Sequence, residues 1–527
     1  MTARGPLEEA WVSPRPARGG SLRVAVAYPN SYWVGMSNLG YQAILRGFLD
    51  VPGFDVRRVF WEGNRLYFPD GSHSLSEFDV VAFSVSFQPD LVHLPRMLEA
   101  GGAAPSAPRG SRPLVLGGGA ALIINPEPAA PFFDLVIIGD SEPVFDNLPD
   151  ILLSAGHLGD REQLLDLVSG LPGAYVPSRY SVVEAKGSRY RIPRPIEPAP
   201  SWVRRSMLSS LDVKPARPAV VARSTEFGSM YPLEISRGCG AKCSFCAASH
   251  VCGPVRFLGL EKMEEEVRTG LKYRKKIGLV GTAVSYHPGL HDAGRMILKL
   301  GGRFSPSSIR LERMTPELAE MLAASGHRTV ALAPEAGTAA LRRTVGKGFT
   351  DDAVMDAVDL LQQARIPGVK LYFMVGLPGE EDCDILAISD LVGHVRDKVV
   401  KAGRRRGKVG SITVSVNPFV PKPHTPLERE PMAAEEVLSR RLKSLREKLG
   451  RMGGVKFQAG SIRGAYLDAL ISLGDRNLGK VLGAFPVGGM SLRKLQRVFP
   501  DADRILFDRR DGELPWTLLG NRSGKVV

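Results

Sequence analysis

The sequence predicts an α/β protein in which a doubly wound parallel sheet precedes a partial (β/α)6 barrel and a small C-terminal region. In residues 21–155, short apolar runs alternate with helical patterns, as in parallel sheets built from βα units. Glycines follow the later apolar runs, at the edge where such sheets bind ligands. From 231 to 430 the alternation recurs six times, fewer than the eight units of a closed barrel.

Length and composition narrow the class of protein. A chain of 527 residues is too long for one core and predicts roughly two or three domains. No apolar run approaches the ~20 residues of a membrane span. Residues 1–20 lack the apolar segment of a secretory signal and are expected to form a disordered tail. Four of the five cysteines fall between 239 and 252, which indicates metal chemistry in a reducing cytoplasm rather than a disulfide framework.

The predicted elements of the N-terminal domain, residues 21–155, follow one another in βα order. The expected strands are 22–28, 54–60, 78–86, 113–116 and 135–138, and the expected helices are 38–49 and 90–100. Residues 156–230 combine short strand-like pieces with the proline-rich stretch 193–218, which predicts a small β extension and a linker.

Six strands are expected in the barrel, residues 231–430, with helices between them. The expected strands are 233–236, 277–281, 308–311, 329–333, 369–375 and 412–416, and the helices are 261–275, 316–324, 351–364 and 384–399. Residues 431–527 begin with a basic amphipathic helix, 433–451, and are expected to form an accessory region.

The formal net charge of +14 admits an anionic partner such as RNA. Basic runs occur at 272–276, 401–408 and 440–451, and Tyr273 is the only aromatic residue in their sequence, whereas single-strand stacking surfaces interleave several. Charge runs are also common on solvated faces. RNA binding is therefore only weakly supported by charge.

The motif Cys239-x3-Cys243-x2-Cys246 directly follows the first barrel strand. Cysteine thiolates hold iron–sulfur clusters, and a cubane cluster usually takes four. Three thiolates in one loop leave one iron free to bind a small molecule. A zinc site is the alternative, but zinc ligands usually come in two pairs and no second CxxC or HxxxH pair is present.

Over about 200 residues the sequence resembles the radical S-adenosylmethionine (SAM) superfamily, in particular its methylthiotransferase-like and Elp3-like branch. The motifs that carry the resemblance are the cysteine loop, Ala333-Pro-Glu335-Ala-Gly337, Lys370 to Glu380 with its Gly376-Leu-Pro-Gly379 turn, and Asn417 to Pro426. The resemblance implies a TIM-type barrel, a 4Fe–4S cluster held by Cys239, Cys243 and Cys246, and reductive cleavage of SAM. A flavodoxin- or ferredoxin-type reductant is also implied, while the catalytic residues stay unassigned.

The same resemblance implies which residues face SAM. Phe245 stands at the family's aromatic position beside the adenine, and Gly281, Thr282 and Ala283 occupy the segment that meets the methionine amine. Glu335 is the expected polar contact at the fourth strand, and Gly376 lets the backbone approach the adenine. Arg310 and Glu312, expected at the end of the third strand, are further candidates for the cavity.

The N-terminal half resembles the flavodoxin-like cobalamin-binding domain of one radical SAM branch. The matching loop residues are Gly117, Gly118, Gly139 and Glu142. The family's Asp-x-His-x-x-Gly motif is missing, because the corresponding loop, 28–35, contains no histidine. Either cobalamin binds without a histidine on cobalt, with methyl or methylthio transfer as the reaction, or the domain has the fold without the cofactor.

The competing class is a non-enzymatic protein, either an iron–sulfur electron carrier or a zinc-stabilised nucleic-acid-binding protein. Cys252 and Cys383 are left out of the ligand set, since lone cysteines are usually buried small hydrophobes. The substrate and the oligomeric state are not predicted, because substrate contacts lie on loops without a shared motif.

Overall fold

The structure is a computed structural model that describes residues 8–15, 19–106, 112–155, 161–185, 187–188, 190–486 and 488–519. The chain divides into two compact units. Unit 1 comprises Met1–Ser229, Leu470–Ala502 and Arg510–Val527, and unit 2 comprises Met230–Ala469 and Asp503–Arg509. The C-terminal region is thus shared between the units, because its segments pack on different cores.

Unit 1 is built on a seven-stranded sheet with the order β4-β3-β2-β5-β6-β7-β8. The five inner strands are parallel, and β4 and β8 pair antiparallel at the two edges. This is the doubly wound, flavodoxin-like order, in which the direction of winding reverses between β2 and β5. The strands are β2 (Leu22–Tyr28), β3 (Phe54–Glu62), β4 (Arg65–Tyr67), β5 (Val80–Ser84), β6 (Leu114–Gly118), β7 (Leu135–Ile137) and β8 (Ala174–Tyr175).

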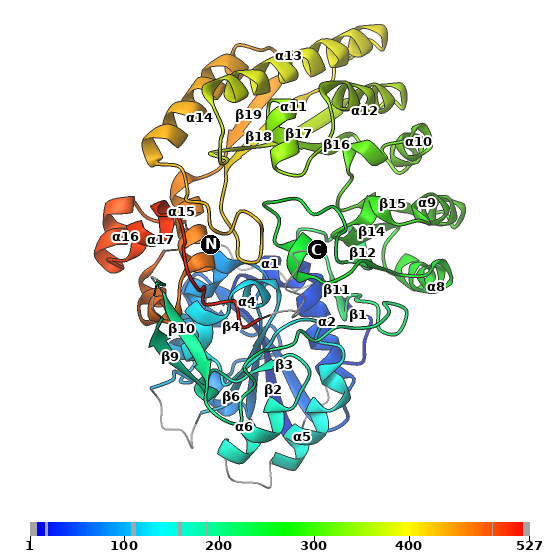
Figure 1. The fold of residues 1–527 in the computed structure, drawn as a ribbon. Helices are drawn as coiled ribbons and strands as arrows, with labels where there is room; N and C mark the ends of the chain where they lie inside the picture. The colour runs from blue at the N-terminus through cyan, green and yellow to red at the C-terminus, as the bar shows by residue number, and fades with distance from the viewer. Residues whose placement is uncertain are drawn as a thin grey trace. The chain divides into compact units, whose positions relative to one another are not determined.

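Helices cover both faces of this sheet (Figure 1). Alternate strand residues such as Val24, Val26 and Leu116 form one core with α2 (Leu39–Leu49), α5 (Leu148–Ala155) and α6 (Arg161–Ser169). On the other face lie α3 (Leu94–Ala100) and α4 (Ala120–Ile124). Outside the sheet are α1 (Tyr32–Ser37), the hairpin β9 (Tyr180–Glu184) and β10 (Arg191–Pro195), and, after the proline-rich linker, β11 (Val220–Ala222).

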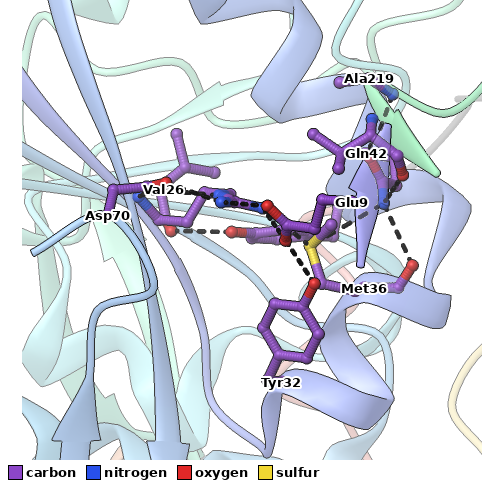
Figure 2. Close-up of polar contacts among 10 residues, drawn as sticks. Glu9, Val26, Tyr32, Met36, Gln42, Asp70 and Ala219 are labelled. Carbon is purple, nitrogen blue, oxygen red and sulfur yellow. Dashed lines mark hydrogen bonds and ion pairs between the residues drawn. The ribbon is translucent and has the colours of Figure 1, made fainter. Parts of the chain in front are cut away.

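The prediction of a disordered N-terminal tail is wrong for β1, Glu9–Trp11, which pairs antiparallel with β11. Residues 1–7 and 16–18 lie outside the described residues. The buried Arg58 guanidinium holds the strand through an ion pair of 2.7 Å to Glu9, and a second ion pair of 2.6 Å to Asp70 fixes the guanidinium itself. Figure 2 shows this polar cluster, in which Tyr32 also bonds Glu9. A charge with two paired carboxylates therefore fixes a segment that composition alone marks as loose.

Unit 2 contains two four-stranded sheets, ordered β13-β12-β14-β15 and β16-β17-β18-β19. All pairings are parallel except the short β13 beside β12. The strands are β12 (Met230–Arg237), β13 (Arg256–Phe257), β14 (Lys276–Gly281), β15 (Arg303–Pro306), β16 (Thr329–Glu335), β17 (Gly368–Val375), β18 (Ile412–Pro418) and β19 (Val455–Ala459). The partial barrel is therefore present, and the unpredicted β19 extends it by one parallel strand.

The longer helices of unit 2 lie outside its strands (Figure 1). They are α8 (Leu260–Leu271), α9 (Leu290–Lys299), α10 (Pro316–Ala324), α12 (Asp351–Gln363), α13 (Asp382–Arg405) and α14 (Glu435–Gly450). The short α7 (Ala248–Val251) and α11 (Ala339–Thr344) follow β12 and β16, and α15 (Ile462–Leu473) is divided between the two units. Within the described residues, no helix is both long and apolar enough to cross a membrane.

The third barrel strand was predicted at 308–311, which is wrong because β15 is Arg303–Pro306. The strand carries a single large apolar residue, Phe304, so its periodic signal is weak. Arg310 precedes, and Glu312 lies in, the 3-10 turn Leu311–Arg313 that follows the strand. Both residues are therefore carried by a loop at the carboxyl end of the barrel rather than by the strand.

Candidate active site at the cysteine loop

The three predicted ligand cysteines lie on the loop that leaves the carboxyl end of β12. None of the chain's cysteines is in a disulfide, and Cys243 is buried while Cys239 and Cys246 are half-buried. The loop turns at Gly238, whose φ of +82° brings it against the Pro254 carbonyl, and the Cys246 amide donates to the Cys243 carbonyl at 3.2 Å. The backbone thus holds the three thiols within one compact turn.

A second segment, α11 and the residues after it, supports this loop from about 100 positions away. The Ser244 amide donates to the Val345 carbonyl at 3.1 Å, and the Leu427 amide donates to the Ser244 carbonyl at 3.3 Å. Phe245 packs on a small apolar cluster. The cluster's buried members are Ala336, Leu341, Val345, Leu377 and Phe419. The structure thus gives Phe245 a packing role, and its predicted contact with adenine stays a prediction.

Gly346 is needed where this segment meets the cysteine loop. Its φ is +79°, and a Cβ there would lie 3.1 Å from the Cys243 Cα and 3.2 Å from the Lys242 carbonyl oxygen. We expect Gly346→Ala to weaken iron binding on the order of tenfold, because a left-handed alanine costs ~1–2 kcal/mol and the loop must shift. Iron and sulfide per chain after anaerobic reconstitution measure the effect.

Gly348→Ala is the matched control, since its Cβ would meet nothing within 4 Å and its φ is not in the left-handed region. The control should load iron like the wild type. Equal iron in the Gly346→Ala protein would show that the loop does not depend on this contact.

Charged side chains surround the loop. Arg310 places Nη1 3.5 Å from the Cys243 Sγ and donates through Nε to Glu312 at 2.5 Å. Burial alone would lower the pKa of Arg310, but its bonds to Cys243 and Glu312 raise it. A fixed positive charge beside the sulfur can offset the negative charge of an iron-bound thiolate.

Glu335 ends β16 with a φ of +70° and lies 3.3 Å from the Lys347 Nζ. Burial raises the pKa of Glu335, and the neighbouring Lys347 and Arg310 partly oppose that rise. Lys347 is itself buried and was not predicted. The one feature of the sequence that could have pointed to Lys347 is its position between Gly346 and Gly348, after a helix with two arginines in its last turn.

The segment Gly281-Thr282-Ala283 follows β14 beside the cysteine loop. The Thr282 hydroxyl donates to the Gly238 carbonyl at 2.5 Å, and the Ala283 amide donates to the Ser236 hydroxyl at 3.3 Å. A Cβ at Gly281 would clash with Ser236. The structure therefore places these three residues at the loop, while their contact with the methionine amine stays a prediction.

Gly376 follows β17 with a φ of +82°, and a Cβ there would lie 2.8 Å from Leu438. Its amide donates to the Glu380 Oε2 at 2.6 Å, and the same oxygen accepts from the Arg441 Nη1 at 2.6 Å. The residue that caps α13 is Glu381 rather than Glu380. Glu380 instead fixes the turn that carries Gly376.

The two remaining cysteines stand outside the predicted ligand set. Cys252 ends the short helix α7, and Cys383 is exposed in the first turn of α13. Among the described residues, no three His, Cys, Asp or Glu side chains surround one position as a single metal ion requires. A cubane cluster makes a different demand, since each thiolate binds a different iron atom.

The four predicted loop residues of unit 1 lie at or beyond the ends of β6 and β7. Gly117 is needed for packing, as its Cβ would meet Phe133 at 2.7 Å. Gly139, with a φ of +119°, lies against the Ser206 backbone of the linker, while a Cβ at Gly118 would make only an ordinary contact, with the Ile137 carbonyl oxygen at 3.8 Å. Glu142 is buried. Packing within unit 1 thus accounts for two of the glycines, and nothing in the structure tests their role toward cobalamin.

A separate polar cluster lies at the winding reversal between β2 and β5. Asp90 and Gln88 are about 95% buried, and the Asp90 Oδ2 and Gln88 Nε2 atoms have no partner within the described part of the chain. Asn30 donates to the Asp90 Oδ1 at 2.7 Å. His93 bonds the Pro29 carbonyl through Nδ1 at 2.7 Å. Unpaired buried polar atoms at this edge indicate a binding site, because ligands of doubly wound sheets bind there.

Burial raises the pKa of Asp90 to about 7, and the Asn30 bond only partly opposes this. Between about pH 4 and pH 7 the folded state keeps a proton that the unfolded state has lost, so stability falls as pH rises, by up to about 4 kcal/mol. Asp90→Asn should remove that dependence. Denaturant unfolding at about pH 5 and pH 8, followed by tryptophan fluorescence, tests this, because all five tryptophans belong to unit 1.

The control is Asp146→Asn, whose side chain is 63% exposed and pairs with Lys214. We expect it to keep the wild-type pH dependence. A parallel pH dependence in the Asp90→Asn and wild-type proteins would mean that Asp90 is ionised throughout this range.

Comparison with known proteins agrees with this architecture. Residues 233–392 match the Radical SAM superfamily, and residues 51–177 match the family of radical SAM proteins, N-terminal. An uncharacterized protein of Methanocaldococcus jannaschii is 24% identical over 461 residues, which are 87% of this chain and 90% of that protein. The tRNA-2-methylthio-N(6)-dimethylallyladenosine synthase of Acidithiobacillus ferrooxidans is 29% identical over 217 residues, but the match covers only 36% of this chain and 44% of that enzyme.

The fold is also similar to a solved structure. The radical S-adenosylmethionine methyltransferase TsrM from Kitasatospora setae aligns with a TM-score of 0.51 and 15% identity, covering 81% of this chain and 77% of that one. This structural similarity concerns the fold alone. The class of chemistry is indicated by the family matches, which imply a 4Fe–4S cluster and SAM as cofactors. From its cysteine loop, its barrel and these matches, the chain is a radical SAM enzyme and belongs to the radical SAM superfamily.

Proposed function

We propose that Cys239, Cys243 and Cys246 hold a 4Fe–4S cluster at which SAM is reductively cleaved. The observation that carries the proposal is the compact loop of three disulfide-free cysteines with a guanidinium 3.5 Å from one sulfur. Arg310 and the buried Lys347 supply positive charge that offsets thiolate charge in a region of low dielectric. When bound, the reduced cluster supplies the electron that splits SAM into methionine and a 5′-deoxyadenosyl radical.

The proposed SAM site lies at the carboxyl ends of the barrel strands, where such barrels carry their active sites. Phe245, Gly281, Thr282, Ala283, Glu335 and Gly376 all occur there, after or at the end of β12, β14, β16 and β17. Half-buried Glu335, with its raised pKa, is suited to accept from a hydroxyl of the ribose or to hold a proton near the carboxylate of SAM. A flavodoxin- or ferredoxin-type protein is the proposed electron donor.

The test is anaerobic reconstitution followed by dithionite and SAM. We expect a brown protein that converts SAM to methionine and 5′-deoxyadenosine, or that transfers a methyl group. A reduced, iron-loaded protein that neither binds nor consumes SAM would end the proposal. Zinc without a visible absorption band would instead favour the non-enzymatic alternative.

For the second half-reaction we favour transfer of a methyl group over transfer of a methylthio group. A methylthio product needs a sulfur donor in addition to SAM. Residues 1–238 contain no cysteine, so a second sulfur-ligated centre in the N-terminal half has no thiolate ligands. SAM labelled in its methyl group, incubated with fractionated host extract, shows where the label goes, and sulfur in the labelled product would reverse the preference.

For unit 1 we propose a corrinoid at the edge between β2 and β5. The unpaired Asp90 and Gln88 atoms suit the amide side chains of a corrin, which both donate and accept hydrogen bonds. His93 is the proposed cobalt ligand. Its Nδ1–H donates to the Pro29 carbonyl, which leaves the Nε2 lone pair available, and burial lowers the pKa of His93 so that the ring is neutral.

Electron paramagnetic resonance of the protein loaded with cob(II)alamin tests this assignment. We expect the cobalt(II) signal to be split by one axial nitrogen. The splitting should persist with a corrinoid that lacks its own nitrogen base, and it should be lost in His93→Ala. His73→Ala, in the same unit, is the control and should keep the splitting. A protein that retains no corrinoid, or a spectrum without that splitting in the wild type, would remove His93 from this role.

A further inference from the structure

A groove of about 420 Å³ lies in unit 2 between α14, the end of β19 and the start of α15. It is separate from the cysteine loop. Its polar lining is mainly cationic or hydroxylic. The charged and hydroxyl residues that line it are Glu435, Ser439, Lys443, Arg446, Ser461 and Arg463.

The three cations of the groove have no carboxylate partner among the residues that the structure describes. Lys443, Arg446 and Arg463 are exposed and make no ion pair there, although Arg446 lies over the Phe457 ring at 5.7 Å. Their neighbours on the same helix behave differently, because Arg440 pairs with Asp382 and Arg441 with Glu380. On α14, Arg440 and Arg441 are therefore neutralised, whereas Lys443 and Arg446 at the groove are not.

The start of α15 adds to this positive potential. The Ser461 hydroxyl accepts from the Gly464 amide at 3.1 Å, whereas the amides of Ile462 and Arg463 have no acceptor in the described chain. Free amides at the first turn of a 12-residue helix favour an anion. One carboxylate, Glu435, also lines the groove and lies near Tyr466 of α15, but it is eight residues before Lys443 and eleven before Arg446, about 12 Å and 16 Å along the helix.

We propose that this groove binds the phosphate groups of a single-stranded nucleic acid. Unpaired cations with free amides match phosphate oxygens, which accept from both. A strand fits better than a compact phosphate because the cations are spread over two helices along an open groove rather than gathered at one point. The formal net charge of +14 supports the encounter with a polyanion.

The groove also lies at the sheet edge that carries the proposed SAM site, on the strand third from β16. Ala459 and Gly460 line it at the carboxyl end of β19, the same edge of the parallel sheet at which β16 ends in Glu335. The proposal goes beyond the function proposed above and does not require it, because binding is measured without SAM or reductant.

The test uses the full chain with its cluster reconstituted and a fluorescein-labelled RNA of roughly 20 nucleotides, with anisotropy as the readout. We expect the triple variant Lys443→Ala, Arg446→Ala, Arg463→Ala to bind on the order of tenfold more weakly. The slope of log affinity against log salt should fall by about 2, since each lost contact to a single strand removes about 0.7.

The control removes the same charge from another exposed basic stretch, Lys401→Ala, Arg404→Ala, Arg405→Ala on α13, and should leave both values unchanged. Equal loss in both triple variants would show charge attraction without a site, and loss in neither would overturn the proposal. Tripolyphosphate competing as well as RNA at equal phosphate concentration would overturn the strand as occupant. SAM cleavage, assayed separately, should be unchanged in both triple variants. Failure of the proposed SAM chemistry can therefore be told apart from failure of the proposed nucleic-acid binding.

Discussion

Replacing Cys243 by alanine should abolish SAM cleavage, with a loss of more than about a thousandfold, because removing a group that acts as part of a unit forfeits nearly the whole effect. Cys243 is the buried member of the three and the one whose sulfur contacts Arg310. Without its thiolate the cluster keeps two protein ligands, so iron and colour should fall together. Iron per chain, the visible spectrum and 5′-deoxyadenosine formed under dithionite are the measurements.

Two other cysteines provide the comparison. Cys383 is exposed on α13, and Cys383→Ala should keep both iron and activity. Cys252→Ala should do the same if one iron is left for SAM. Iron loss in Cys252→Ala as severe as in Cys243→Ala would mean that a fourth side chain fills the cluster, and the proposed chemistry would have no vacant position.

Arg441→Met should destabilise unit 2 by about 3–5 kcal/mol, since removing one partner of a buried ion pair leaves the other charge uncompensated. The side chains of Arg441 and Glu380 are 10% and 1% exposed, and Arg441 donates both to the Glu380 carboxylate and to its main-chain carbonyl at 2.6 Å. The Gly376 amide shares the same carboxylate, so the turn after β17 should loosen too. Hydrogen exchange of the residues around Gly376 and unfolding followed by circular dichroism measure both effects.

Arg440→Met is a closely matched control, because the neighbouring Arg440 is 65% exposed and meets Asp382 at 3.3 Å. Its effect should be below about 1 kcal/mol. In the double variant Glu380→Gln, Arg441→Met much of the loss should be recovered, because no buried charge remains. Similar stability of the Arg441→Met and Arg440→Met proteins would contradict the role given to the pair.

Local sequence patterns predicted most of the elements that carry the site. The run Leu22–Tyr28 and the helix Pro316–Ala324 have the predicted bounds, and the strand Val369–Val375 differs by one residue. Apolar periodicity and the positions of Gly and Pro depend only on near neighbours, so they can be read without the fold. The patterns failed where this signal is short: β15 has one large apolar residue, and β19, Val-Lys-Phe-Gln-Ala, alternates over only five positions.

The amino-acid sequence alone determines the spacing of Cys239, Cys243 and Cys246 and the alternation of strands and helices. Because few residues separate the three cysteines, the chain limits how far apart their sulfur atoms can be. Which distant groups reach them was decided by folding: Arg310 lies 67 residues from Cys243, and Val345 meets Ser244 from 101 positions away. The burial of Asp90 and the pairing of Glu380 with Arg441 are of the same kind. Such contacts depend on how helices and strands pack, and no single stretch of sequence contains both of their partners.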